Sequence, residues 1–265
     1  MGIETKNLQI KYGDKLILKN ANFRVNNEEI VTIIGPNGSG KTTLIKALSR
    51  YIKAYSGNIY LGGKDIYTIQ TKKIAREMAI LPQVKHVSAD ITVENLVSYG
   101  RYPHLSFGKR IGKDDKDIIH WAIEKTGLVK LKDRYIGNLS GGERQRAWIA
   151  MALAQKPKIL ILDEPTTYLD ISYQLEVLEL VKELNQSLGI TVIMVLHDLN
   201  QAARYSDKIY VLKDGEVCQY GKPNSILQTK LLKDVFRIEA HIYEDKINDC
   251  PYFIPHKIIE MSIID

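Results

Sequence analysis

Four short, almost continuous runs of apolar residues stand out in the hydrophobic pattern of the chain. They lie at residues 30–34, 78–81, 159–162 and 190–196, and most of their side chains are isoleucine, leucine or valine. Runs of this length without an alternating polar position are typical of strands covered on both faces of a parallel sheet. The pattern therefore predicts an α/β fold whose core is a mostly parallel sheet.

The first 25 residues follow a different pattern, in which apolar and polar positions alternate. The alternation stops at the turn Tyr12-Gly13-Asp14 and then resumes, which predicts an N-terminal pair of antiparallel strands beside the strand at 30–34. A second antiparallel hairpin is expected around Asp214-Gly215, and two short strands are expected between Ala240 and Ile254. The fold thus combines a parallel core with antiparallel additions.

Helical spacing of apolar residues fills most of the remaining chain. The expected helices cover residues 41–48, 71–77, 92–98, 114–127, 140–154 and 171–188. Their expected N-caps include Thr92, Asp114, Ser140 and Asp170. The polar, basic stretch Tyr99 to Lys113 is expected to be a loop. Because three of these helices follow one another with no apolar strand among them, we expect a helical subdomain inserted into the α/β core.

Composition narrows the class of protein. The chain has 265 residues, of which 45% are hydrophobic and 26% charged, as in an ordinary soluble protein. No apolar run approaches the roughly 20 residues of a membrane span, and the N-terminus does not resemble a signal peptide, so we expect a cytoplasmic location. The net charge of +6 is mild, and the basic residues form no long patch with interleaved aromatics, so nucleic acid is not an expected partner. Cys218 and Cys250 are expected to be free thiols.

The segment Gly35 to Thr42, directly after the first apolar run, fits the phosphate-binding pattern G-x-x-x-x-G-K-[ST]. Glycines let the backbone adopt conformations that a Cβ would forbid, so that successive N–H groups can point at phosphate oxygens. Lys41 can supply a charge for the β- and γ-phosphates, and the Thr42 hydroxyl can ligate Mg²⁺. A glycine-rich turn without a ligand is the alternative, but the strand before it and the helix after it favour nucleotide binding.

A second glycine-rich segment, Leu139 to Glu143, opens the helix at 140–154. Ser140 and Glu143 have the spacing of a capping box, in which each side chain accepts a hydrogen bond from the other residue's backbone N–H. Gly141 and Gly142 are poor helix formers, which requires an explanation. Either bare N–H groups approach an anion at this helix start, or the helix start packs closely against a neighbour.

Polar residues follow the later apolar runs. Asp163 and Glu164 end the run at 159–162, and His197 ends the run at 190–196. Ligands of α/β proteins bind at the carboxyl ends of parallel strands. Asp163 therefore suits Mg²⁺, Glu164 can orient or deprotonate a water molecule, and His197 can face the γ-phosphate. Tyr12 is either an ordinary turn residue or an aromatic that stacks on a base.

The glycine-rich loop, LSGGE and ILILDE occur in one chain and in this order, and the sequence therefore resembles the ATP-binding cassette (ABC) family of ATPases. The resemblance extends over nearly the whole chain and implies ATP and Mg²⁺ as ligands. It implies a single domain over residues 1–265. The RecA-like core with its antiparallel β subdomain would cover residues 1–82 and 155–222, the helical subdomain 83–154 and a C-terminal segment 223–265.

The same resemblance implies a role for each matching residue. Glu164, His197 and Gln83 would be catalytic, and Thr42, Gln83 and Asp163 would hold the metal ion. The signature residues Ser140 to Glu143 and the D-loop residue Asp170 would contact the nucleotide of a second copy. The remaining nucleotide-binding residues would be Tyr12, Gly35, Pro36, Asn37, Gly38, Ser39, Gly40, Lys41, Thr42 and Thr43.

Three further segments are similar to the importer ATPases for iron–siderophore complexes, haem and vitamin B12. They are VSYGRYPH from Val97, TTYLDISYQLE from Thr166 and HDLNQAARYSD from His197. The similarity implies a homodimer at the cytoplasmic side of the cell membrane, bound to polytopic permease subunits and served by an extracytoplasmic binding protein. A soluble ABC ATPase acting on ribosomes or DNA is the alternative, although the chain has neither a second P-loop nor long heptads. A P-loop kinase or GTPase would not need LSGGE.

Overall fold

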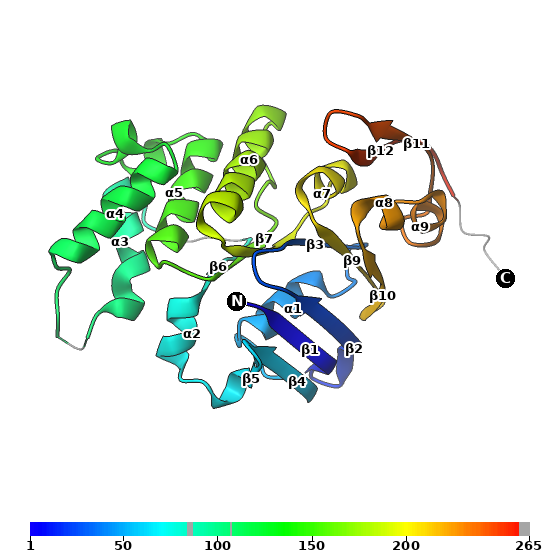
Figure 1. The fold of residues 1–265 in the computed structure, drawn as a ribbon, viewed down its shortest axis with the longest axis horizontal. Helices are drawn as coiled ribbons and strands as arrows, with labels where there is room; N and C mark the ends of the chain where they lie inside the picture. Colours follow the sequence, from blue (N-terminus) through cyan, green and yellow to red (C-terminus); the bar gives the residue numbers. More distant parts are fainter. Residues whose placement is uncertain (84–86, 107, 260–265) are drawn as a thin grey trace.

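A six-stranded sheet runs through the middle of the protein (Figure 1), as seen in the computed structural model, which describes residues 1–83, 87–106 and 108–259. Each strand is parallel to its neighbours except β10, which is antiparallel to β9. This confirms the prediction of a mostly parallel core. In spatial order the strands are β10 (Glu216–Gly221), β9 (Lys208–Lys213), β3 (Ile30–Ile34), β8 (Thr191–Val195), β7 (Ile159–Asp163) and β6 (Met78–Leu81).

The central strands are buried on both faces, which explains their uninterrupted apolar sequence. In β3, Val31 and Ile33 join one hydrophobic cluster, while Ile30 and Ile34 join another on the opposite face. Strands β7 and β8 divide their side chains in the same alternating way. Since successive side chains of a strand point to opposite faces, only a sheet with a covering layer on each side can bury all of them.

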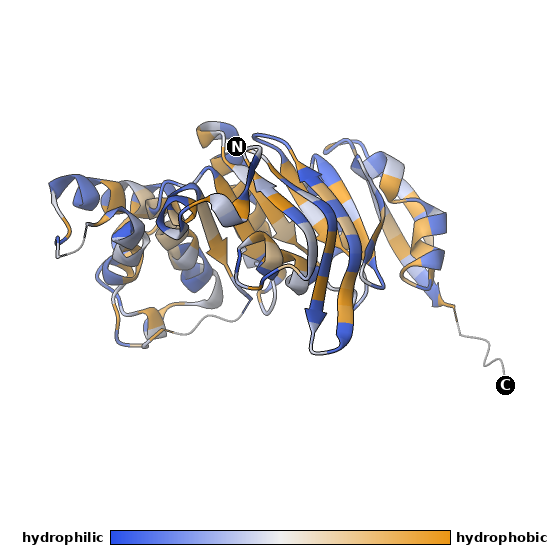
Figure 2. Cartoon of the chain, turned by 90° about the horizontal axis from the view of Figure 1, so that it is seen from below, coloured by the Kyte–Doolittle hydropathy of each residue, from blue (hydrophilic) through white to orange (hydrophobic). Residues whose placement is uncertain are grey.

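A second sheet covers one face together with helix α1 (Lys41–Leu48). It has the order β2-β1-β4-β5 and is antiparallel throughout. Figure 2 shows bands of hydrophobic and hydrophilic residues alternating along the strands. The alternation correctly predicted antiparallel strands, but their expected place beside β3 was wrong, because they form a separate sheet that packs face to face. The strands are β1 (Ile3–Tyr12), β2 (Lys15–Val25), β4 (Ser56–Leu61) and β5 (Lys64–Asp65).

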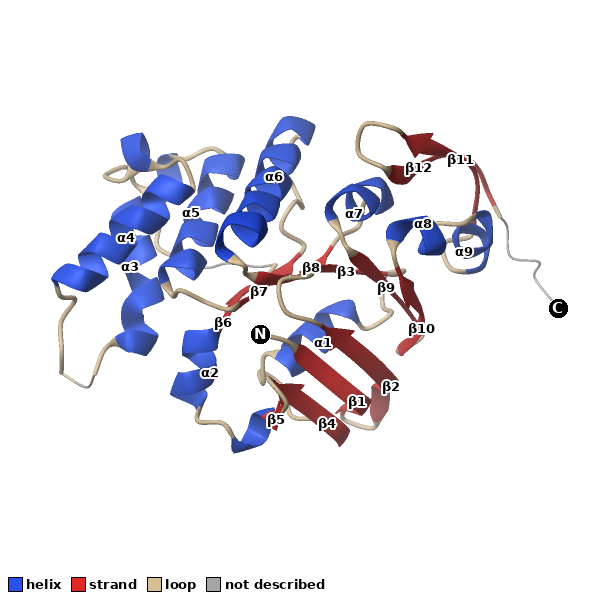
Figure 3. Cartoon of the chain, in the orientation of Figure 1, coloured by secondary structure: helices blue, strands red, loops and turns tan. Residues whose placement is uncertain are grey.

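Helices gather over the other face and beyond the β6 edge (Figures 1 and 3), in agreement with the predicted helical insertion. Thr92 caps the first of these helices, accepting a hydrogen bond from the Asn95 N–H. The expected cap Asp114 is wrong: Gly112 occupies the N-cap position, and the Asp115 carboxylate accepts from its N–H. The helices are α3 (Val93–Ser98), α4 (Lys113–Lys125), α5 (Gly141–Ala154), α6 (Ile171–Leu188) and α7 (Leu199–Tyr205).

The loop expected over Tyr99 to Lys113 is only partly a loop. Residues Tyr99–His104 form the 3₁₀-helix η2, which continues directly from α3. Arg101 is only 6% exposed there; it donates to the Asp115 carboxylate at 2.9 Å and to the Ala154 carbonyl at 2.7 Å. Arg101 therefore connects η2 to α4 and α5, because a buried guanidinium needs several hydrogen-bond acceptors.

The remaining elements flank the core. A short helix, α2 (Thr71–Glu77), precedes β6, and a 3₁₀-helix, η1 (Ile66–Thr68), precedes α2. The two strands expected near the C-terminus are confirmed as the hairpin β11 (Ile238–Asp245) and β12 (Cys250–Ile258), which packs against α7, α8 (Pro223–Ile226) and α9 (Thr229–Asp234). Among the described residues, no helix has the length and apolar composition needed to cross a membrane.

Candidate functional site

The register of the parallel strands brings four chain segments to one edge of the central sheet. Asp163, the last residue of β7, pairs with Val195 of β8, and Val195 pairs in turn with Ile33 of β3. Leu81 pairs with Leu162 in the same way. The residues that follow these pairs must therefore leave the sheet side by side. They are Gly35, Gln83, Glu164 and His197.

The glycine-rich loop connects β3 to α1. Gly35 has a φ of 152°, and a Cβ at this position would lie 2.0 Å from the Leu212 carbonyl oxygen, so no other residue type fits here. Gly40 is the N-cap of α1 and provides no side-chain cap for the first N–H groups of the helix. A helix start of this kind carries a partial positive charge and favours an anion.

The Lys41 side chain folds back over this loop. It is only 6% exposed, and its ammonium group donates to the carbonyls of Gly35 at 2.8 Å and Pro36 at 2.9 Å. Burial lowers the pKa of Lys41, while the nearby carboxylates of Glu164 and Asp163 act in the opposite direction. The cation is thus held at the loop by weak carbonyl acceptors that a phosphate can replace.

Asp163 is a buried carboxylate with one unused oxygen. Its side chain interacts with the Thr42 hydroxyl, whereas Oδ1 is buried and has no hydrogen-bonding partner among the described residues. Burial, and secondarily the charge of Glu164, raises the pKa of Asp163. A carboxylate in this position is destabilised until a cation neutralises it. Asp163 and Thr42 therefore have the chemistry of hard oxygen ligands for Mg²⁺.

Three side chains surround the carboxylate of Glu164. Gln83 Nε2 donates to Oε2 at 2.5 Å, and the Thr167 hydroxyl donates to the same oxygen at 3.2 Å. His197 Nε2 lies 2.6 Å from Oε1. Glu164 itself has a φ of 53°, in the left-handed region that non-glycine residues rarely occupy. The carboxylate is thus fixed in position and direction, as a group that must orient a water molecule would be.

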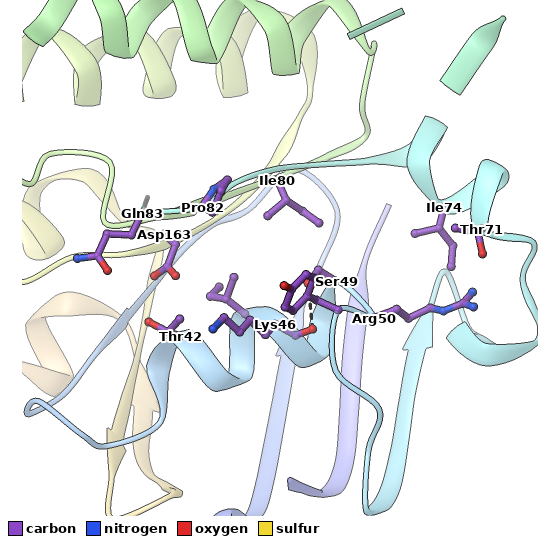
Figure 4. A pocket seen from close by; sticks show the side chains of 12 residues that line it. Thr42, Lys46, Ser49, Arg50, Thr71, Ile74, Ile80, Pro82, Gln83 and Asp163 are labelled. Carbon is purple, nitrogen blue, oxygen red and sulfur yellow. Dashed lines mark hydrogen bonds between the residues drawn. The ribbon is translucent and has the colours of Figure 1, made fainter. Parts of the chain in front are cut away.

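An open cleft of about 820 Å³ begins at this cluster and follows α1 (Figure 4). Thr42, Gln83 and Asp163 lie at one end, and Arg50 points toward Thr71 at the other. Figure 4 shows Ile80 and Pro82 across the cleft from α1. The cleft therefore connects the metal-ligand candidates to the outer surface next to α2. Its remaining lining residues are Ile45, Lys46, Ser49, Tyr51 and Ile74.

The second glycine-rich segment lies apart from the first. Figure 1 shows α5 among the helices and α1 on the other side of the β6–β7 edge. The expected capping box at its start is confirmed, because Ser140 N donates to the Glu143 carboxylate at 2.8 Å and Glu143 N to the Ser140 hydroxyl at 3.3 Å. Asp170 is at the N-cap of α6 but makes no side-chain capping bond. Tyr12 is half exposed at the end of β1.

The structure supports the close-packing explanation for the glycines of α5. A Cβ at Gly142 would lie 2.4 Å from Tyr173 Cδ1, and a Cβ at Gly141 would lie 3.0 Å from Leu169 Cδ2. The helix start is thus pressed against the first turn of α6 and the residue that precedes its N-cap. Close packing does not exclude an anion at the exposed end of α5, since the two glycines can serve both purposes.

Sequence reasoning found most of the cluster and missed Thr167. No local pattern identifies this threonine, because its role depends on the turn that folds it back onto Glu164. The Thr167 N–H donates to the Glu164 carbonyl at 3.4 Å, which closes that turn.

A phosphate-binding loop, a buried aspartate beside its threonine and a fixed glutamate at adjacent strand ends define a P-loop nucleoside triphosphatase. The ABC transporter family model matches residues 18–167, which is more than half of the chain. The chain belongs to the ABC transporter family, as one of its ATP-hydrolysing subunits. This confirms the resemblance inferred from the glycine-rich loop, LSGGE and ILILDE.

Curated relatives match almost end to end. The chain is 46% identical over 258 residues to the iron(3+)-hydroxamate import ATP-binding protein FhuC of Bacillus subtilis strain 168, covering 97% of this chain and 96% of FhuC. It is 45% identical over 247 residues to the petrobactin import ATP-binding protein FpuC of Bacillus anthracis, covering 93% and 90%. The ferric enterobactin transport ATP-binding protein FepC of Escherichia coli K12 is 40% identical over 248 residues, covering 94% and 92%.

Solved structures agree with this placement. A chain from an inward-facing ABC transporter assigned to the metal-chelate type superimposes with a TM-score of 0.84 at 27% identity, covering 97% of both chains. The ATP-binding cassette MJ0796, in a dimeric post-hydrolysis state with ADP and phosphate, superimposes with a TM-score of 0.71 at 30% identity, covering 83% of this chain and 98% of MJ0796. The α/β fold with a helical subdomain is therefore that of an ABC ATPase.

The packing of Gly142 against Tyr173 generates a stability prediction. Gly142→Ala is expected to lower the free energy of unfolding by about 1–3 kcal/mol relative to Gly141→Ala, because its methyl group meets the tyrosine ring. Gly141→Ala is the matched control, since it gains the same helix propensity and meets only the flexible end of Leu169. Urea unfolding of both variants measures the difference. Equal stability of the two variants would show that close packing does not require the second glycine.

Proposed function

We propose that this chain is the ATP-hydrolysing subunit of an importer that carries iron–siderophore complexes into the cell. The proposal that the chain hydrolyses ATP rests on the Glu164 carboxylate, which is fixed between Gln83 and His197 beside the loop that contains Lys41. The relatives named for siderophore import, matched along more than nine-tenths of the chain, support the transport part. They also favour transport over the alternative of a soluble ATPase acting on ribosomes or DNA.

The nucleotide is ATP, and its phosphates lie in the loop between β3 and α1. Backbone N–H groups of this loop and the Lys41 ammonium bind the β- and γ-phosphates, while Tyr12 stacks on the base. Ser39 supports this proposal, since its hydroxyl is buried without a hydrogen-bonding partner among the described residues. The other phosphate-loop residues are Pro36, Asn37, Gly38, Gly40 and Thr43.

Asp163 and Thr42 would hold Mg²⁺, and Gln83 would provide a further contact to the ion. The unused oxygen of Asp163 and the neighbouring hydroxyl supply the oxygen donors that this ion requires. When bound, the ion neutralises charge that develops on the phosphates. Asp163 binds the ion, and Glu164, one residue farther along, is left free for the water molecule.

Hydrolysis depends on Glu164. Its carboxylate accepts a proton from, or orients, the water molecule that attacks the γ-phosphate, and Gln83 and Thr167 keep it in place through hydrogen bonds. His197 lies at the end of the adjacent strand and can change its contact from the carboxylate to the γ-phosphate when ATP arrives. Lys41 leaves its carbonyl acceptors for the phosphates in the same step.

The complete site requires two copies of the chain. The start of α5, residues Ser140 to Glu143, lies apart from the phosphate loop of its own protomer (Figure 1) and therefore serves the ATP of the partner, together with Asp170. The dimeric structure of MJ0796 with ADP and phosphate supports such an assembly. Tyr168, which is 98% exposed between Glu164 and Asp170, provides further surface for the second copy.

Permease subunits bind the surface that contains the cleft of Figure 4 and the segment 83–113. Gln83 links this surface to Glu164, and Tyr102 is exposed on η2. The His104 ring donates from Nε2 to the Gln155 carbonyl at 2.8 Å, so it supports η2 from inside the fold and does not contact the permease itself. Part of this segment, residues 84–86 and 107, lies outside the described residues.

The domain limits follow from the same proposal. The RecA-like core with its β subdomain comprises residues 1–82 and 155–222, the helical subdomain comprises 83–154, and 223–265 form a C-terminal segment. ATP-driven closure of two such chains moves the permease, so the dimer is peripheral, on the cytoplasmic side of the cell membrane. An extracytoplasmic binding protein delivers the cargo, and no nucleic acid takes part.

Glu164→Gln tests the hydrolytic proposal. The substitution keeps the shape of the side chain and removes its charge, so turnover should fall by about 10²–10⁴-fold while ATP still binds. Less repulsion toward the γ-phosphate should let the variant accumulate as an ATP-bound dimer, visible by size-exclusion chromatography at low ionic strength. Turnover at the parent rate would mean that the base lies elsewhere, with His197 the next residue to examine.

Uptake by a deletion strain tests the cargo. Loss of this chain should abolish uptake of at least one ferric siderophore among hydroxamates, petrobactin and enterobactin. The parent chain should restore that uptake, whereas Lys41→Ala should not, because the lysine neutralises the phosphates. Haem and cobalamin uptake are measured in parallel. Unimpaired uptake of every ferric siderophore would overturn the proposed cargo, even if ATP hydrolysis is intact.

A further inference from the structure

Two glutamine side chains connect the element after His197 to the segment that ends at Asp170. Gln201, on α7, donates from Nε2 to Gln174 Oε1 at 2.6 Å. Gln174, on α6, donates from Nε2 to the Leu169 carbonyl at 2.8 Å. Gln174 follows Leu169 by five residues, in the first turn of α6, whereas Gln201 comes from α7, and the two bonds join all three residues into one hydrogen-bonded relay.

The Leu169 carbonyl sets the direction of this relay. A carbonyl only accepts hydrogen bonds, so the amide nitrogen of Gln174 must face it, and the amide oxygen of Gln174 must face Gln201. Gln201 then has to donate with its own nitrogen. Its oxygen is left buried without a hydrogen-bonding partner among the described residues. Since a buried unpaired oxygen is unfavourable, the donor bond to Gln174 must hold Gln201 in this orientation.

The relay has a defined group at each end. At the α7 end, the Asp198 carboxylate accepts from the Gln201 N–H at 3.0 Å and so caps the helix directly after His197. At the other end, the Leu169 side chain lies against Gly141 at the start of α5. The relay therefore spans from the residue beside Glu164 to the helix start that faces a second copy.

The segment it holds is conformationally strained. Glu164 and Tyr168 both adopt left-handed backbone angles, with φ of 53° and 64°, although neither is glycine. Such residues keep these angles only when surrounding contacts enforce them. Leu169 follows Tyr168 directly, so the bond to its carbonyl is one of the contacts that hold the backbone next to the exposed Tyr168.

We propose that Gln174 and Gln201 are positioning residues that hold segment 166–170 in register with His197, so that occupancy of one ATP site sets the surface offered to the other copy. The proposal rests on the shared ATP sites of the proposed function. Movement of His197 toward the γ-phosphate shifts the start of α7, and Gln201 and Gln174 transmit that shift to Leu169. Neither glutamine touches ATP.

The test compares Gln174→Leu, Gln201→Leu and their double variant with Asn185→Leu. Asn185 is the matched control because it lies on the same helix and also donates from its amide to two backbone carbonyls, those of Glu28 at 2.7 Å and Ile190 at 2.8 Å. ATP affinity of the separate protomer, kcat, and ATP-driven dimerisation in the Glu164→Gln background are measured for each chain, together with the melting temperature.

The ATP affinity of each Gln variant should stay within about twofold of that of the parent, while its kcat and its dimer affinity fall about tenfold. A tenfold effect is typical of energetic coupling between two sites. The double variant should be no worse than the poorer single variant, since both remove the same relay. Asn185→Leu should lower the melting temperature at least as much, yet keep kcat and dimer affinity. Gln174→Glu, which faces the Leu169 carbonyl with an oxygen, should behave like Gln174→Leu.

Two patterns would overturn the relay: Gln variants that match Asn185→Leu in kcat and dimer affinity, or defects that add independently in the double variant. Either outcome leaves the proposed function intact, because the parent still hydrolyses ATP and the Glu164→Gln chain still dimerises. If the parent shows no hydrolysis and Glu164→Gln no dimer, the proposed function fails first, and the relay fails with it.

Discussion

The parallel register of β3, β8, β7 and β6 is the constraint on which the rest of this structure depends. A shift of one residue in any of these ladders would exchange the two buried faces and would move Gly35, Gln83, Glu164 or His197 away from the others. The apolar residues therefore do more than stabilise a core. They fix where each strand ends, and four chemically different groups meet because those ends are aligned.

Electrostatics at this edge leave the site prepared for its ligands. Asp163 is buried with an unused oxygen and a raised pKa, and Lys41 is buried on carbonyls that bind it weakly. Each charge is paired only in part, which costs folding free energy, and the binding of Mg²⁺ and phosphate in the proposed function would remove that cost. Sites of this kind commonly trade stability for function. The strained backbone of Glu164 fits the same pattern.

The local sequence pattern was enough to predict the features that depend on where a strand ends or a helix begins. The apolar runs located β3, β7 and β8, so the polar residues behind them could be assigned to one edge of the sheet from the sequence alone. The capping box at Ser140 was predictable for the same reason, because both of its partners lie within one helical turn.

Features that depend on tertiary neighbours were not predictable. Alternation in residues 1–25 indicated strands but not the separate sheet to which they belong, since periodicity does not identify a pairing partner. The charged residue Arg101 suggested a loop, whereas its buried acceptors come from α4 and α5. The contact between Gln174 and Gln201 joins two helices, and nothing in either sequence segment distinguishes it from a pair of surface amides.

In the proposed function, one protomer provides only half of each ATP site. Mixing the Lys41→Ala and Ser140→Arg variants tests this most directly, because a dimer of either variant alone has the same defect in both of its ATP sites. A mixed dimer regains one site with an intact phosphate loop and an intact start of α5. The mixture should hydrolyse ATP faster than the sum of the separate variants, approaching about a quarter of the parent rate for random, symmetric pairing. No gain on mixing, or near-parent turnover by Ser140→Arg alone, would contradict the shared site.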